Sequence, residues 1–164
     1  MMSLIFPLAL VTTAQASEVR GAHPAEVEQR LAFLVEDWTI EGMESTYRET
    51  CRWYHGRSFV VCETVDRSEG EPSHSVSILG WSAAAEHYTY HHYGQNGRSR
   101  SEDCFANALQ GLTCLGERRT ETGLVQSRSH IWPVEGGAAF RQERSENGGP
   151  WTESVSLKYV PRRD

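Results

Sequence analysis

From Trp38 onward, apolar and polar residues alternate in short runs that are separated by turn-forming residues. The runs are rich in aromatic and β-branched residues, which is typical of β-strands with one buried face. Glycine, asparagine and proline mark turns at 69–72, 94–97, 135–137 and 147–150. We therefore predict strands over residues 38–47, 50–54, 58–66, 73–82, 86–93, 98–105, 111–119, 124–132, 138–145 and 151–160.

Before the strands, apolar residues recur with the period of a helix. Over residues 24–35, Val27, Leu31 and Leu34 recur at helical spacing, so that one side of a helix would be apolar. Pro24 suits the first helical position, and the acidic residues that follow suit the positive end of the helix dipole. The sequence predicts one short helix before the first strand.

About ten consecutive strands with no helix between them predict an antiparallel meander and an all-β fold. An open meander would leave two exposed edges, whereas closure into a barrel removes both. We expect a closed barrel of about ten strands, wide enough for a ligand cavity. A two-sheet sandwich is the alternative.

The 164 residues divide into three predicted parts. An apolar run at 4–11, followed by the small-x-small residues 14–16, predicts a signal peptide over 1–16, with a buried N-terminal strand as the alternative. Residues 17–35 form a lead-in and the short helix, and residues 36–162 form the barrel. A signal peptide would send the chain to the periplasm or out of the cell, and we expect no membrane span in the mature protein.

Four cysteines predict two disulfides in such an oxidising compartment. Cys51 and Cys62 flank a turn centred on Gly56 and Arg57, which would place the two cysteines opposite each other across a hairpin. Cys104 and Cys114 flank another turn in the same way. Zinc binding and redox catalysis usually use a close CxxC pair, and the sequence has none.

In residues 31–42 a predicted helix runs into a first strand at Trp38. Further distinctive segments are Trp53 with Gly56 and Arg57, residues 78–81, and residues 145–151. In these segments the chain resembles an uncharacterised bacterial family of calycin-like β-barrels, a family of unknown function with lipocalin- or nitrobindin-like architecture. The resemblance implies a barrel with a ligand cavity, and it brings no reaction or catalytic residues.

The net charge and the histidine positions indicate which classes of partner and cofactor to expect. A net charge of −6 argues against nucleic-acid binding, which requires a basic face. On one strand His91 and His92 would point to opposite faces, and His87 would lie about 13 Å from His91, so these three do not predict a metal site. We expect no metal or other cofactor, and a haem barrel with His130 as axial ligand is kept as an alternative.

A candidate ligand site follows from the register of the last three strands. With Gln142 opposite Val155 and His130 opposite Phe140, one strand face gathers aromatic and polar residues. An apolar wall with a few hydrogen-bonding groups is typical of ligand pockets. The alternative is that this face simply packs as core. The predicted ligand-binding residues are Arg128, His130, Trp132, Phe140, Gln142 and Trp151.

The leading functional hypothesis is a periplasmic or secreted barrel that binds a small, partly apolar molecule in its lumen. An anionic group on that molecule would suit Arg128. No nucleophile or metallohydrolase motif is present, so the sequence favours a binding protein over an enzyme. A small hydrolase or isomerase that acts in the lumen, and an envelope structural or interaction protein, are the alternatives.

Overall fold

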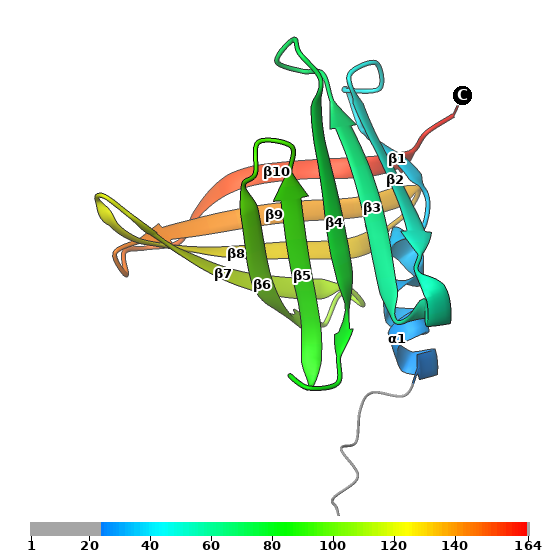
Figure 1. Ribbon diagram of the computed structural model, residues 1–164, viewed down its shortest axis with the longest axis horizontal. Helices are drawn as coiled ribbons and strands as arrows, with labels where there is room; N and C mark the ends of the chain where they lie inside the picture. Colours follow the sequence, from blue (N-terminus) through cyan, green and yellow to red (C-terminus); the bar gives the residue numbers. More distant parts are fainter. Residues whose placement is uncertain (1–23, 164) are drawn as a thin grey trace, which may run out of the picture.

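The computed structural model describes residues 24–163, which form a closed barrel of ten antiparallel strands preceded by a short helix (Figure 1). Each strand pairs with the next along the chain, and β1 closes the barrel by pairing with both β10 and β2. The predicted all-β barrel is therefore confirmed. The predicted signal peptide and most of the lead-in lie outside the described residues.

The elements follow the predicted order closely. They are α1 (Pro24–Leu31), the 3-10 turn η1 (Ala32–Leu34), β1 (Asp37–Ile40), β2 (Tyr47–Trp53), the 3-10 turn η2 (His55–Arg57), β3 (Phe59–Asp66), β4 (Ser73–Ser82), β5 (His87–Gly94), β6 (Ser99–Ala106), β7 (Leu112–Thr120), β8 (Gly123–Val134), β9 (Gly137–Glu146) and β10 (Thr152–Pro161).

One predicted strand is too long. We expected residues 38–47 to form a single strand, but β1 ends at Ile40 and the chain turns before β2 begins at Tyr47. Gly42 has a φ of +84°, a conformation that glycine adopts readily, and Met43 and Thr46 make turn hydrogen bonds.

The barrel consists of two groups of strands that cross at a large angle. In Figure 1, β2–β6 stand upright and β7–β10 run across them, so the two groups enclose the lumen between them. Side chains alternate between the lumen and the outer surface along each strand.

The lumen is filled with apolar side chains at the end covered by α1. Val27 and Leu31 of the helix are buried, and they belong to one cluster with Val60, Leu112 and Trp38. The Trp38 indole Nε1 donates a hydrogen bond to the Leu34 carbonyl 2.8 Å away, which fixes the junction between helix and first strand. Packing on α1 thus closes one end of the barrel.

Both predicted disulfides are present, Cys51–Cys62 and Cys104–Cys114. Each joins residues that are directly opposite in a hairpin, β2 with β3 and β6 with β7. All four cysteines are buried at the helix-covered end of the lumen. Because disulfides persist in oxidising compartments, the two bridges are compatible with a location outside the cytoplasm.

None of the helices in the described part of the chain is both long and apolar enough to cross a membrane.

Candidate functional site

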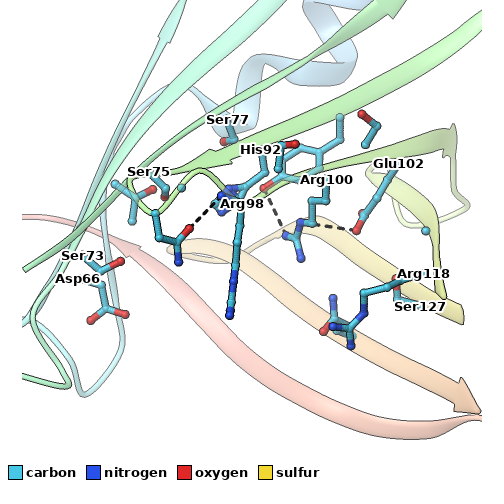
Figure 2. A pocket seen from close by; sticks show the side chains of 18 of the residues that line it. Asp66, Ser73, Ser75, Ser77, His92, Arg98, Arg100, Glu102, Arg118 and Ser127 are labelled. Carbon is cyan, nitrogen blue, oxygen red and sulfur yellow. Dashed lines mark hydrogen bonds and ion pairs between the residues drawn. The ribbon is translucent and has the colours of Figure 1, made fainter. Parts of the chain in front are cut away.

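The other end of the lumen is a polar cavity of about 920 Å³ (Figure 2). Serines of β4 line one wall, and arginines reach into it from β6 and β7 and from β9 on the far side. Three tyrosines contribute ring surface as well as hydroxyl groups. The lining includes Tyr47, Glu49, Thr64, Asp66, Ser73, Ser75, Ser77, Tyr90, His92, Arg98, Arg100, Glu102, Glu117, Arg118, Ser127, Gln142, Arg144 and Tyr159.

Three of the lining arginines have no side-chain partner in the described part of the chain. Among the described residues, no carboxylate or other side chain makes an ion pair or hydrogen bond with the guanidinium of Arg98, Arg118 or Arg144. A guanidinium carries five N–H donors and stays charged at any ordinary pH. The cavity therefore offers guanidinium donors that a bound anion could use, beside the four carboxyl groups that also line it.

Arg100 is instead held by its neighbours. Its Nε lies 3.7 Å from Glu102 Oε1, and its guanidinium lies over the Tyr90 ring at 5.3 Å from the ring centre. The Glu102 side chain is almost fully buried, and burial raises the pKa of its carboxyl although the charge of Arg100 opposes this shift. Gly116 makes room for Glu102, because a Cβ there would lie 3.1 Å from Glu102 Cγ and 2.8 Å from Ser127 Oγ.

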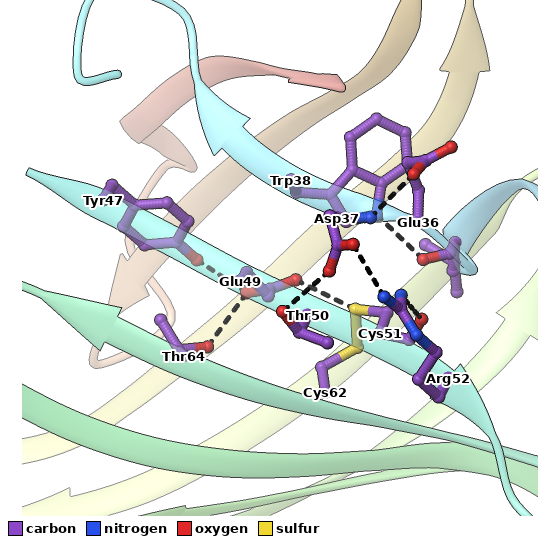
Figure 3. The surroundings of a disulfide bond; sticks show 11 residues. Glu36, Asp37, Trp38, Tyr47, Glu49, Thr50, Cys51, Arg52, Cys62 and Thr64 are labelled. Carbon is purple, nitrogen blue, oxygen red and sulfur yellow. Dashed lines mark hydrogen bonds and ion pairs between the residues drawn. A yellow bond between two sulfur atoms is a disulfide. The ribbon is translucent and has the colours of Figure 1, made fainter. Parts of the chain in front are cut away.

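Glu49 lies deeper in the lumen, between the polar cavity and the Cys51–Cys62 disulfide (Figure 3). Its Oε2 accepts hydrogen bonds from the Tyr47 hydroxyl at 2.6 Å and from Thr64 Oγ1 at 3.1 Å. Its Oε1 lies 3.3 Å from Cys51 Sγ, and a disulfide sulfur has no proton to donate. Burial raises the pKa of the Glu49 carboxyl, and the two hydroxyl donors only partly oppose that shift.

Two tyrosines and one histidine of the lining have shifted pKa values that favour their neutral forms. Burial raises the pKa of Tyr47 and of Tyr159 far above the usual phenol value, so both hydroxyls keep their protons. Burial, and next the charge of Arg100, lower the pKa of His92. The Nδ1 atom of His92 is buried and has no hydrogen-bond partner among the described residues.

The structure divides the predicted ligand-binding residues between two faces. Gln142 lines the cavity, and Phe140 lies on the same face of β9. Ser127 of β8 also lines the cavity, so its neighbour Arg128, together with His130 and Trp132, points to the outer surface.

A register shift of one residue accounts for this division. Phe140 pairs with Ile131 and not with His130, because β8 and β9 are joined by a two-residue turn at Glu135 and Gly136. The expected pair Gln142–Val155 is confirmed, whereas a bulge in β10 places Thr152 opposite Arg144. His130 therefore lies outside the lumen and cannot serve as an axial ligand for haem within it.

On the outer surface, three of the predicted residues and their neighbours form a second polar cluster. Glu143 Oε2 lies 2.6 Å from Arg128 Nε and 3.3 Å from His130 Nε2, and Thr113 Oγ1 lies 2.9 Å from His130 Nδ1. The Arg128 guanidinium stacks over the Trp151 ring at 4.4 Å from its centre. Here Arg128 is fully engaged, and the hydrogen bond from it lowers the pKa of the Glu143 carboxyl.

Sequence reasoning missed the serines and arginines that line the cavity. A period of two was visible in Ser73, Ser75 and Ser77, and again in Arg98 and Arg100. A run of polar residues at that spacing is usually assigned to the solvent face of a strand. In this barrel the opposite face of β4 is the outer one, so the polar stripe lines the lumen.

Metal binding has one candidate group among the described residues. Glu49, Cys51 and Cys62 offer atoms that lie within 4.8 Å of one another. Both sulfurs belong to the disulfide, so neither is the thiolate that would bind a metal ion. The residues therefore do not fit a metal site in the oxidised protein.

Neither the models of known protein families nor the curated proteins match this chain.

Proposed function

We propose that the polar half of the lumen binds a small anionic molecule that also carries hydrogen-bonding groups. The observation behind this proposal is that Arg98, Arg118 and Arg144 line the cavity without a partner among the described residues. Guanidinium groups bind carboxylates and phosphates through paired, charge-assisted hydrogen bonds. An anion would therefore complete contacts that the protein leaves open.

The rest of the lining supports a ligand that is polar over most of its surface. Ser75, Ser77 and Ser127 offer hydroxyl groups, and the buried His92 Nδ1 lacks a partner. The rings of Tyr90 and Tyr159 supply the apolar contact that the sequence led us to expect. A cavity of about 920 Å³ suits a guest of ordinary metabolite size. The periplasm or the extracellular space is the proposed compartment, as the disulfides permit.

The experiment compares two double variants with the same change in net charge. Arg118 and Arg144 line the lumen, whereas Arg119 and Arg141 lie on the same two strands and point outward. Calorimetric titration of the folded protein with citrate and with inorganic phosphate gives the affinity for each anion. Retained ligands are identified in parallel by native mass spectrometry of the purified protein.

We expect R118Q/R144Q to weaken binding of the tighter anion by at least about tenfold, because each charge-assisted hydrogen bond contributes about 1.5–3 kcal/mol. R119Q/R141Q should change the affinity by less than about twofold, because screening makes exposed charges at a distance weak. Equal losses in the two double variants, or no binding of either anion to the wild-type protein, would contradict the proposal.

A further inference from the structure

The barrel wall is open along part of the junction between β6 and β7. These strands pair only where Asp103–Ala106 face Leu112–Leu115, next to the Cys104–Cys114 disulfide. Beyond that point residues 99–102 pair only with β5, and residues 116–120 pair only with β8. We call the two facing, unpaired strand edges at 99–102 and 116–120 the seam.

The cavity lining shows that these edges face the lumen. Along β4 every second residue lines the cavity, namely Ser73, Ser75 and Ser77. At the seam, by contrast, residues 99–102 and 116–118 line it without interruption. Because neighbouring residues of a strand point to opposite faces, an uninterrupted run exposes the strand edge itself. Backbone N–H and C=O groups of both edges are therefore available to a guest.

Charged groups surround the seam unevenly. Arg98 and Arg100 lie on its β6 side and Arg118 on its β7 side, and all three are exposed to solvent. Two carboxyl groups lie with them, that of Glu117, which is exposed beside Arg118, and that of Glu102, which is buried against Gly116 where the seam begins. Because the arginines outnumber these carboxyl groups, an acidic partner is attracted. A second copy of the same chain, paired edge to edge, would bring its own arginines against these and be repelled.

We propose that the seam binds an extended acidic peptide segment of another protein, which adds a strand to the β6 or β7 edge and places its carboxylates against Arg98, Arg100 and Arg118. The unpaired edges span four and five residues, or about 14–17 Å of strand. Addition of a strand to a free edge gains affinity from backbone hydrogen bonds, and side chains set the specificity. The inference rests on the proposed function in one respect, the attraction of anionic groups by the lumen arginines.

The test uses a fluorescent, end-capped hexapeptide of alternating glutamate and valine, followed by fluorescence anisotropy with the oxidised full-length protein. Two control peptides separate the contributions. The first control is the glutamate peptide with N-methyl groups on alternate backbone amides. It is made in two versions, methylated at the odd or at the even positions, so that each version removes the N–H donors from one edge of the peptide. The other has lysine at every glutamate position.

We expect the glutamate peptide to bind, at least one N-methylated version to bind at least about tenfold more weakly, and the lysine peptide not to bind. R118Q should weaken binding severalfold, whereas R119Q should not. Hydrogen exchange of the protein should slow at residues 99–102 or 116–120 when the peptide is bound. Equal binding of all glutamate peptides, or protection elsewhere only, would overturn the inference because charge alone would then explain the affinity.

Failure of this inference is distinguishable from failure of the proposed function. Binding of citrate or phosphate without any binding of the glutamate peptide overturns the seam proposal and leaves the anion site standing. Peptide binding that depends on free backbone amides, without binding of either small anion, supports the seam and overturns the small-anion proposal.

Discussion

Two carboxyl groups, those of Glu49 and Glu102, lie in the lumen where ionisation costs free energy. Desolvation is the largest cause of the raised pKa at each of them. At Glu49 this cost is partly offset because Tyr47 and Thr64 donate hydrogen bonds to one of the carboxyl oxygens. Each carboxyl thus holds a proton more tightly in the folded chain than in the unfolded chain, which links folding to pH.

The sign of this linkage leads to a prediction for Glu49→Gln. The folded pKa lies above the ordinary value of 4.5, so the contribution to stability is greatest below pH 4.5 and is lost as the pH rises through the folded pKa. The variant should be more stable than the wild-type protein at pH 8, by about 1.4 kcal/mol for each pKa unit of the shift. The difference should vanish near pH 4. Urea denaturation at both pH values measures it.

Glu63 provides the control for this comparison. It lies on the neighbouring strand β3, is exposed, and has no hydrogen-bond partner for its side chain among the described residues. Glu63→Gln should change stability by less than about 0.5 kcal/mol at either pH, as is usual for surface substitutions. A Glu49→Gln variant that is less stable than the wild type at pH 8 would show that ionised Glu49 is favourable.

A glycine of the lumen gives a second prediction at this scale. A Cβ at Gly116 would lie 2.8 Å from Ser127 Oγ and 3.1 Å from Glu102 Cγ, so both side chains must move in Gly116→Ala. Overpacking of this kind costs about 1–3 kcal/mol, which chemical denaturation measures. Adding Ser127→Gly removes the closer clash and should restore part of the loss. If the double variant is no more stable than Gly116→Ala alone, the clash with Ser127 is not the cause of the lost stability.

At the scale of the elements, strand positions were predictable because the turns are chemically distinct. All ten strands and the helix appear close to their expected positions, and apart from single residues at strand ends only 41–46 was misread as strand. Both hairpin disulfides also followed from the turn positions. We expected a two-residue turn at Gly56 and Arg57. The turn is longer, because the Tyr54 N–H donates a hydrogen bond to the Phe59 carbonyl, but its centre is unchanged and so is the register at the cysteines.

Strand faces were harder to predict, because a slip of one residue reverses every side chain. The sequence at 135–137 allows a turn of two or three residues, and the shorter one forms, with Gly136 at a φ of +71°. As a result, the outer surface of β8 carries Arg128, His130 and Trp132, which we had placed in the lumen. The lumen is lined instead by polar residues of the kind that a sequence pattern assigns to solvent. Bulges have the same effect locally, as in β10 between Glu153 and Val155.

The two disulfides allow a prediction at the element scale. Each closes a loop of about ten residues and lies within the buried cluster at the helix-covered end. Replacing both cysteines of the Cys104–Cys114 pair with alanine should lower the free energy of unfolding by about 2–4 kcal/mol. Denaturation of the oxidised protein measures this loss. Replacement of Cys51 and Cys62 should cost a similar amount, and no loss in either variant would contradict the prediction.

At the scale of the whole molecule, the lumen is divided along its length into an apolar half under α1 and a polar half that opens at the seam. The ion pair between Arg57 and Glu28 ties the helix to the turn after β2, and Leu31 packs in the apolar half. The arginines of the cavity lie in the other half. Residues that stabilise the barrel are therefore largely separate from those that we propose to bind ligand.

This separation predicts opposite behaviour for two variants. Leu31→Ala leaves a void in the apolar half and should cost about 2–5 kcal/mol of stability. At a temperature where it remains folded, it should bind citrate or phosphate within about twofold of the wild-type affinity. R118Q/R144Q should lose affinity with little change in its unfolding midpoint, because neither arginine has a partner among the described residues. Loss of anion affinity in folded Leu31→Ala, measured by calorimetry, would show instead that packing under the helix sets the shape of the polar cavity, and that the barrel acts as one coupled unit.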